Sequence, residues 1–295
     1  MRPLLLVLAL APLAVAAVSA QPAYRPPAED ASVSLDVLTG VGDDLDGVVT
    51  DDQGAFVGAS RIRVLSTVAL LSARVPVGGR WTVVGEVPFA YVRARGSATL
   101  DPSSRVPAFE SSDAQLGNPY LGAEVWTGAG LTLGAGVRLP LAQFDETPEP
   151  VGAVYAGLTA DTERSEAHLA ETLAFSAVGR YVRDLTPGLG LRLGLVPVYL
   201  VDTSGARGGS DVALGYQAHL NAAFGRAVVS AGAVGRRFLT DNTYAFVGSD
   251  VAVSLGAAVE VGGVRPGLQA RVPLVGNDYL GVDAVVGLSL DVPLR

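Results

Sequence analysis

The segment 280–294 alternates between apolar residues and residues that are mostly small, polar or charged. All of its even positions are apolar, from Leu280 to Leu294, whereas its odd positions include Gly281, Asp283 and Asp291. Because successive side chains of a strand point to opposite faces, this pattern predicts one strand with a continuous apolar face. At ~3.3 Å per residue it would be roughly 50 Å long. Strands of soluble proteins usually have about five or six residues, so the segment favours a β-barrel that crosses a lipid bilayer.

The same alternation predicts twelve strands in all. The apolar stripes span 33–41, 65–75, 81–91, 121–125, 131–141, 173–181, 189–199, 212–224, 227–239 (where both faces are small or apolar), 251–261, 264–274 and 280–294. Tight turns fall at 78–79, 128–129, 185–187, 225–226 and 262–263, and longer polar connections at 42–60, 96–117, 143–170, 203–210, 240–247 and 275–278. Bacterial outer-membrane barrels combine an even strand number with short periplasmic turns and longer outer loops. We therefore expect an all-β protein, a transmembrane antiparallel up-and-down β-barrel of 12 strands with both termini periplasmic. A soluble all-β domain with a second sheet over the stripes is the alternative fold.

Residues 1–20 have the pattern of a secretory signal peptide. Arg2 is followed by an apolar run over 4–17 and by the small residues Val18-Ser19-Ala20. The run is shorter than the ~20 residues of a spanning helix. We expect Sec-dependent secretion, a single barrel domain over 21–295, and a location in the outer membrane of a diderm bacterium.

The amino-acid composition limits the kinds of partner that the protein can bind. The formal net charge is −8, which argues against nucleic acid, and the absence of cysteine excludes disulfides and thiolate metal sites. The expected partners are outer-membrane lipid and a small-molecule solute, while the oligomeric state stays open. Aromatic residues near both ends of the strands, such as Trp81, Phe224 and Tyr91, fit the two aromatic girdles of a membrane barrel.

Proline recurs inside the predicted strands, as in Arg74-Val75-Pro76, Arg138-Leu139-Pro140 and Arg271-Val272-Pro273. Proline cannot donate a hydrogen bond to the ladder. We therefore expect bulges or ladder ends at these residues.

Two neighbouring segments resemble a known family. Leu116-Gly117-Asn118-Pro119-Tyr120-Leu121-Gly122 opens a strand, and Leu131–Pro140 follows with a strand that ends in a Leu-Pro step. This resembles the MetA-type outer-membrane barrels of phenol-degradation pathways, which are described as transporters; there an acidic residue stands where this chain has Asn118. The resemblance covers about 25 residues and implies passive uptake of small hydrophobic or aromatic compounds.

Polar residues on the face opposite the apolar stripes are the candidates for lining a lumen. They are Arg74, Glu86, Glu124, Arg138, Arg180, Arg192, Gln217, His219, Asn221, Glu260, Gln269, Arg271, Asp283 and Asp291. Charges inside a membrane protein usually face a cavity and pair with one another. Inward glycines such as Gly134, Gly136, Gly194 and Gly287 would leave room, so we expect a narrow pore. The alternatives are a plugged, structural or surface-interaction barrel with the loops 42–60, 96–117 and 143–170 as contacts, and an outer-membrane hydrolase built around His219.

No cofactor or metal site is expected, and no catalytic residue is assigned. The chain has no phosphate-binding loop, dinucleotide fingerprint or zinc-ligand spacing. Asp44-Leu45-Asp46-Gly47 resembles the start of a calcium loop but lacks the Glu that completes it, so calcium binding in the acidic loops stays open. His168 lies in the acidic connection 143–170 and is expected to be solvated.

Overall fold

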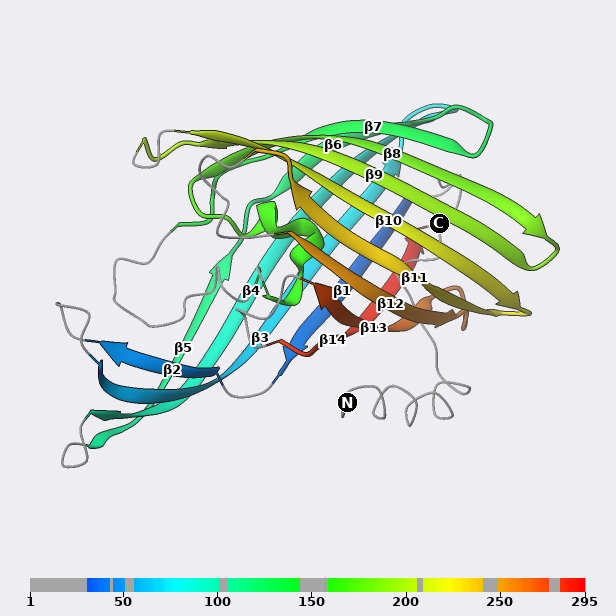
Figure 1. Ribbon diagram of the computed structural model, residues 1–295. Coiled ribbons are helices and arrows are strands. Elements are labelled where there is room, and N and C mark those ends of the chain that lie inside the picture. Colours follow the sequence, from blue (N-terminus) through cyan, green and yellow to red (C-terminus); the bar gives the residue numbers. More distant parts are fainter. Residues whose placement is uncertain are drawn as a thin grey trace.

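The computed structural model describes residues 31–42, 45–50, 56–100, 105–143, 157, 159–205, 209–240, 249–275 and 282–294. Almost all of them form antiparallel strands (Figure 1). The strands are β1 (Ala31–Val41), β2 (Leu45–Thr50), β3 (Phe56–Pro76), β4 (Trp81–Leu100), β5 (Arg105–Leu116), β6 (Tyr120–Trp126), β7 (Leu131–Arg138), β8 (Thr172–Thr186), β9 (Leu189–Asp202), β10 (Ser210–Phe224), β11 (Ala227–Phe238), β12 (Asp250–Val259), β13 (Arg265–Val275) and β14 (Ala284–Leu294), with one 3₁₀ helix, η1 (Thr162–Ala167).

The strands close into a barrel. β1 pairs with β14 along its whole length, from Ala31 opposite Leu294 to Val41 opposite Ala284, and its other edge pairs with β3. The ring continues from β3 to β4 and β6, and then in chain order from β7 to β14. Twelve strands therefore form the closed ring, as predicted, and no free edge remains between its first and last members.

β5 and β6 are two halves of one interrupted strand. Both pair with β4: β6 along its first part, to Glu86, and β5 from Phe89 onward. Pro88 stands at the gap and has no N–H to donate, while its carbonyl oxygen accepts from the Gly117 amide at 2.9 Å. The expectation of ladder ends and bulges at prolines is confirmed here and again at Pro273, where the register between β12 and β13 shifts.

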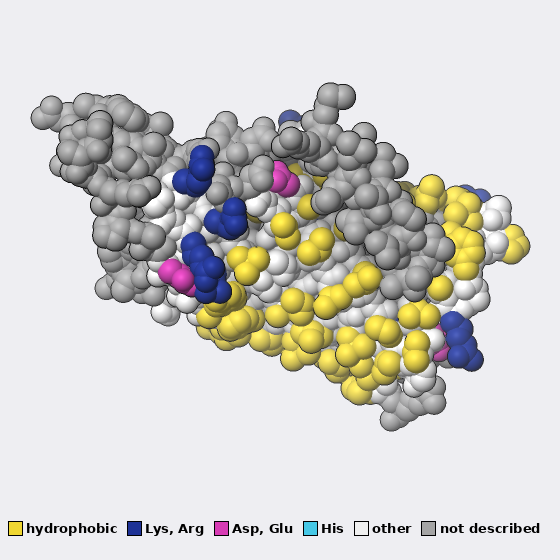
Figure 2. All heavy atoms as spheres, turned by 90° about the horizontal axis from the view of Figure 1, so that it is seen from below, with side chains coloured by type: hydrophobic (Ala, Val, Ile, Leu, Met, Phe, Trp, Pro, Cys, Tyr) yellow, Lys and Arg dark blue, Asp and Glu magenta, His cyan; other side chains and the backbone are white. Residues whose placement is uncertain are grey.

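The predicted apolar stripes face outward. Leu71, Leu121, Leu195 and Leu288 are each at least half exposed, and the space-filling view shows such side chains as a broad apolar band over the barrel (Figure 2). No second sheet covers the stripes among the described strands. The soluble alternative is thereby excluded, because it requires such a cover.

The last strand is shorter than predicted. β14 begins at Ala284, and residues 276–281 lie outside the described part of the chain. Val282, which we expected on the outward face, is buried inside the barrel in a cluster with Leu38, Val68 and Val92. The alternation is interrupted there: Asp283, between Val282 and β14, is exposed, while its amide still donates to the carbonyl oxygen of Val41 at 2.9 Å.

The predicted loops 42–60 and 96–117 are in large part strands. β3 and β4 continue past the barrel, β2 pairs with the far half of β3, and β5 pairs with the far half of β4. Figure 1 shows these strands as an extension that projects from one end of the barrel. The search for continuous apolar stripes missed them because arginines such as Arg63 and Arg95 interrupt the outward stripes of β3 and β4. None of the described helical segments is long and apolar enough to cross a membrane.

Candidate functional site

A segment of the connection 143–170 folds back into the barrel. It comprises residue 157 and residues 159–171, includes η1, and is called the plug below (Figure 1). Asp161, Ser165 and Ala170 are at most 1% exposed. The expectation of a solvated outer loop is wrong for this part. Its acidic residues are stable inside the barrel because cationic side chains of the wall pair with them.

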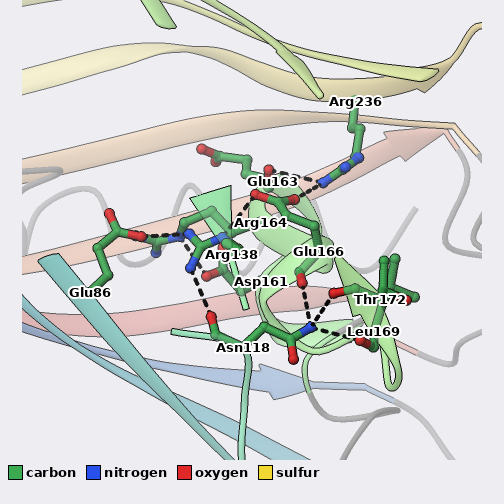
Figure 3. A network of polar contacts seen from close by, with 10 residues as sticks. All are labelled: Glu86, Asn118, Arg138, Asp161, Glu163, Arg164, Glu166, Leu169, Thr172 and Arg236. Atoms are coloured by element: carbon green, nitrogen blue, oxygen red, sulfur yellow. Dashed lines mark hydrogen bonds and ion pairs between the residues drawn. The ribbon is translucent and has the colours of Figure 1, made fainter. Parts of the chain in front are cut away.

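Asn118 fastens the plug to the wall. Its side-chain amide donates to the backbone carbonyl oxygens of Glu166 at 3.0 Å and Leu169 at 2.7 Å, and its side-chain oxygen accepts from the amide of Ala142 at 2.8 Å (Figure 3). The Asn118 backbone amide also donates to the carbonyl of Ala167 at 2.6 Å. The Asn118 side chain is completely buried. An acidic residue would lack the N–H groups that these carbonyls need, which gives the replacement noted above a physical reason.

Gly117 lets the plug approach the wall. A Cβ atom at this position would lie 2.3 Å from the backbone oxygen of Ala167 and 3.1 Å from Nδ1 of His168. Because the first of these atoms is backbone, no rotation of a side chain relieves the contact. The Gly117-Asn118 step is therefore a docking site for the plug.

Arginines from three strands hold the plug carboxylates. Glu166 binds Arg236 of β11 and lies 3.4 Å from Nε of Arg138 of β7. Arg271 of β13 lies 3.0 Å from Glu163 and 3.7 Å from Asp161. Arg138 also links two strands of the barrel wall, because its guanidinium group lies 2.5 Å from the Glu86 carboxylate of β4. Figure 3 shows Arg138 and Arg236 approaching the plug from different strands.

The plug carboxylates differ in how burial and the neighbouring arginines shift their pKa. Burial tends to raise the pKa of Glu166, but the guanidinium groups of Arg236 and Arg138 outweigh it and hold that pKa below its usual range. Burial raises the pKa of Glu163, and the charge of Arg271 does not offset it. Arg236 and Arg138 thus favour the charged form of Glu166.

His168 is neutral inside the barrel. It is 2% exposed, and burial lowers its pKa from 6.5 to about 4. Its imidazole lies so close to Gly157 that a Cβ atom there would be 2.1 Å from the ring. The expectation that His168 is solvated is wrong, because the plug carries it inward.

Beside the plug lies a polar cavity of about 260 Å³. Ten of the predicted lumen residues line it: Arg74, Glu86, Glu124, Arg138, Arg180, Arg192, Gln217, Gln269, Arg271 and Asp291. Glu124 joins two of the arginines, with Arg74 at 2.5 Å and Arg180 at 2.6 Å. The cavity extends from the plug toward the strand ends that carry the tight turns, since Arg192 and Asp291 lie near those ends of β9 and β14.

The other four predicted residues lie elsewhere. Glu260 and Asp283 are exposed, Asn221 is half-buried on β10, and His219 is buried but does not line the cavity. In the described part of the chain, neither ring nitrogen of His219 has a hydrogen-bond partner. The serine or acid that a hydrolase mechanism requires beside it is therefore not in hydrogen-bonding contact there.

Several lining residues were not predicted. Asp36 of β1 and Tyr216 of β10 lie in strands that were recognised, and Asp36 has the inward parity of its strand, so the sequence held a signal for it. Arg236 is on the strand whose faces could not be told apart. Glu163 and Glu166 come from the plug, and strand periodicity carries no signal for a segment that is not a strand.

The inward glycines do not simply open the lumen. A Cβ atom at Gly136 would lie 2.3 Å from the Tyr120 ring, and one at Gly194 would lie 2.7 Å from Gln217. These glycines therefore make space for large neighbouring side chains. The guanidinium of Arg138 lies over the Tyr120 ring, 5.2 Å from its centroid.

Among the described residues, no group of three or more histidine or carboxylate side chains is arranged to hold a metal ion. Of the first acidic cluster, Asp46 belongs to β2, whereas Asp43, Asp44, Asp51 and Asp52 lie outside the described residues, as does the segment 145–149.

The fold matches that of a solved membrane channel. The crystal structure of an outer membrane channel from Pseudomonas putida F1 aligns with a TM-score of 0.54 and 14% sequence identity, covering 93% of this chain and 99% of that one. This likeness shows a common fold.

Two further solved structures align less closely. The CymD monoaromatic hydrocarbon channel has a TM-score of 0.43 and 9% identity, covering 90% of this chain and 89% of its own. The toluene transporter TbuX from Ralstonia pickettii has a TM-score of 0.43 and 10% identity, covering 92% of each chain. No family model and no curated protein matches the sequence.

Proposed function

We propose that the protein is an outer-membrane channel for the passive passage of small solutes, controlled by the plug. The observation that carries the proposal is the polar cavity of about 260 Å³ inside a closed barrel whose outer face is apolar. An apolar exterior suits lipid, and a polar interior suits an aqueous path. The chain reaches the membrane through the signal peptide 1–20, and the tight turns and both termini face the periplasm.

The size of the cavity limits the solute. Ligand pockets usually measure about 300–1,000 Å³, so this cavity admits small molecules. Its lining includes Tyr120 and Tyr216 beside charged groups. Small hydrophobic or aromatic compounds with a polar substituent fit this mixture, in line with the family resemblance of the sequence.

Reconstitution in liposomes tests the proposal. Single-channel conductance and liposome swelling are measured for the wild type and for Glu166→Gln, which leaves Arg236 and Arg138 without their plug carboxylate. Glu110→Gln, on the exposed face of β5, is the matched control. We expect small or infrequent conductance from the wild type, larger or more frequent openings from Glu166→Gln, and wild-type behaviour from the control.

The second candidate is a non-conducting structural or surface-interaction barrel. The specific observation that favours it is the burial of the plug inside the lumen. A folded barrel that gives neither conductance nor swelling, in the wild type and in Glu166→Gln alike, would reject the channel and support this candidate.

A further inference from the structure

Four arginine side chains lie together on the outer face, where β3 and β4 leave the barrel. Arg61 and Arg63 belong to β3, and Arg93 and Arg95 belong to β4. Arg63 stands directly opposite Arg95 in the ladder. All four have the parity of the outward apolar stripes, and the Arg95 side chain is 57% exposed. We call these four residues the arginine patch.

The arginine patch begins where the apolar band ends. On β3 the exposed apolar residues run from Val75 to Leu65. Ten residues at ~3.3 Å each, on a strand tilted by about 40°, rise about 25 Å along the barrel axis, which is the height of the apolar band of membrane barrels. Arg63 is the next outward residue after Leu65, and Arg93 stands opposite Leu65. The patch therefore lies at the headgroup level of the leaflet on the loop side.

Figure 2 shows the same arrangement on the surface. Basic side chains gather beside one end of the apolar band, with an acidic side chain among them. On β4 the apolar stripe below the patch includes Phe89, which is 44% exposed, and on β5 it includes Leu116, which is 46% exposed. A lipid whose headgroup reached the patch would lay its acyl chains over these residues.

The patch brings four guanidinium groups together, and two of them share one carboxylate. Glu110 of β5 is one carboxylate shared by two guanidinium groups: it accepts from Nε of Arg93 at 2.6 Å and lies 3.1 Å from Arg95. Asp46 of β2 stands opposite Arg61 in the ladder. Like charges directly opposite one another, as at Arg63 and Arg95, destabilise a strand pair. A phosphate group over this pair would offset the repulsion between the two guanidinium groups.

We propose that the arginine patch binds the phosphate groups of an anionic glycolipid of the lipid A type in the outer leaflet. Arginine suits this ligand because its planar fork of N–H donors matches phosphate oxygens. The inference rests on the proposed insertion in the outer membrane with the loop side outward. It does not depend on whether the barrel conducts.

Native mass spectrometry of the purified, folded barrel tests the proposal with lipid A as the probe. We expect the wild type to retain lipid A, and the double variant Arg63→Gln/Arg95→Gln to bind it at least tenfold more weakly. The matched control is Arg80→Gln/Arg183→Gln, which removes the same charge from two exposed arginines near the tight turns and should bind as the wild type does. Glu110→Gln should bind more tightly, because it removes the carboxylate that competes with the phosphates.

Any one of three results would overturn the proposal. The first is equal binding of lipid A by the wild type and by the Arg63→Gln/Arg95→Gln variant, and the second is equal binding of lipid A and of its dephosphorylated form. The third is full displacement of lipid A by inorganic phosphate at the same concentration. The last would indicate a site for free phosphate. Heat-modifiable migration on a gel confirms that each variant is a folded barrel. A barrel that binds lipid A but never conducts would refute the proposed channel and leave the lipid site supported.

Discussion

Replacing Asn118 by leucine should release the plug while the barrel stays closed. Leucine has a similar shape but no hydrogen-bonding group, so the carbonyls of Glu166 and Leu169 and the amide of Ala142 would lose their partners. A buried polar group without a partner costs about 1–3 kcal/mol. Only the two carbonyls belong to the plug, so losing their partner weakens docking by about 2 kcal/mol at the least. Since 1.4 kcal/mol is a factor of ten, the undocked population should rise about 30-fold or more.

Limited trypsin digestion of the reconstituted barrel measures this release. Arg164 belongs to the plug and lines the cavity inside the barrel while the plug is docked, where a protease cannot enter, so cleavage after Arg164, followed by mass spectrometry, reports the undocked state. Single-channel conductance should increase in parallel. Asn221→Leu, on the inward face of β10 away from the plug, is the control. If Arg164 of the Asn118 variant stays as resistant as in the wild type, Asn118 does not hold the plug and the reasoning is refuted.

Two further predictions concern the docked plug. Acidification should weaken docking between pH 6.5 and about 4, because undocked His168 binds a proton that the buried ring, with its pKa of about 4, does not. The loss of docking free energy approaches about 3 kcal/mol. Conductance of the wild type should therefore increase as the pH is lowered. If a His168→Phe variant shows the same increase, protonation of His168 is not its cause. Gly117→Ala should also displace the plug, since its Cβ would lie 2.3 Å from the Ala167 oxygen, and should lower the melting temperature. The control is Gly215→Ala, where the nearest atom to the added Cβ would be 3.6 Å away. Equal melting temperatures for the two variants would show that the barrel wall shifts to accommodate the Gly117→Ala methyl group.

Strand periodicity predicted the barrel well because a lipid-facing surface must be apolar without interruption. The stripes around Leu71, Leu195 and Leu288 had to face outward for this reason, and their number gave the strand count. Inside the barrel no such rule holds. The inward position of Asp36 could be inferred from the alternation along β1. That of Arg236 could not, because the two faces of β11 are similar in composition.

The plug could not be predicted from composition. Asp161, Glu163, Glu166 and His168 are what an exposed loop would contain. The three carboxylates lie inside the barrel because Arg138, Arg236 and Arg271 meet them from separate strands. Such pairing depends on side chains that are far apart in sequence. The Gly117-Asn118 step was noticed as a motif, yet its role required the plug to be seen against it.

The pairing of β1 with β14 has a consequence for how the protein is made. The ladder that pairs Ala31 with Leu294 joins strands that are far apart in the sequence, so it can form only after β14 has been synthesised. Until then β1 and β13 each present an unsatisfied edge, which is prone to pair with other chains. A chain shortened before Ala284 would therefore remain an open, aggregation-prone sheet.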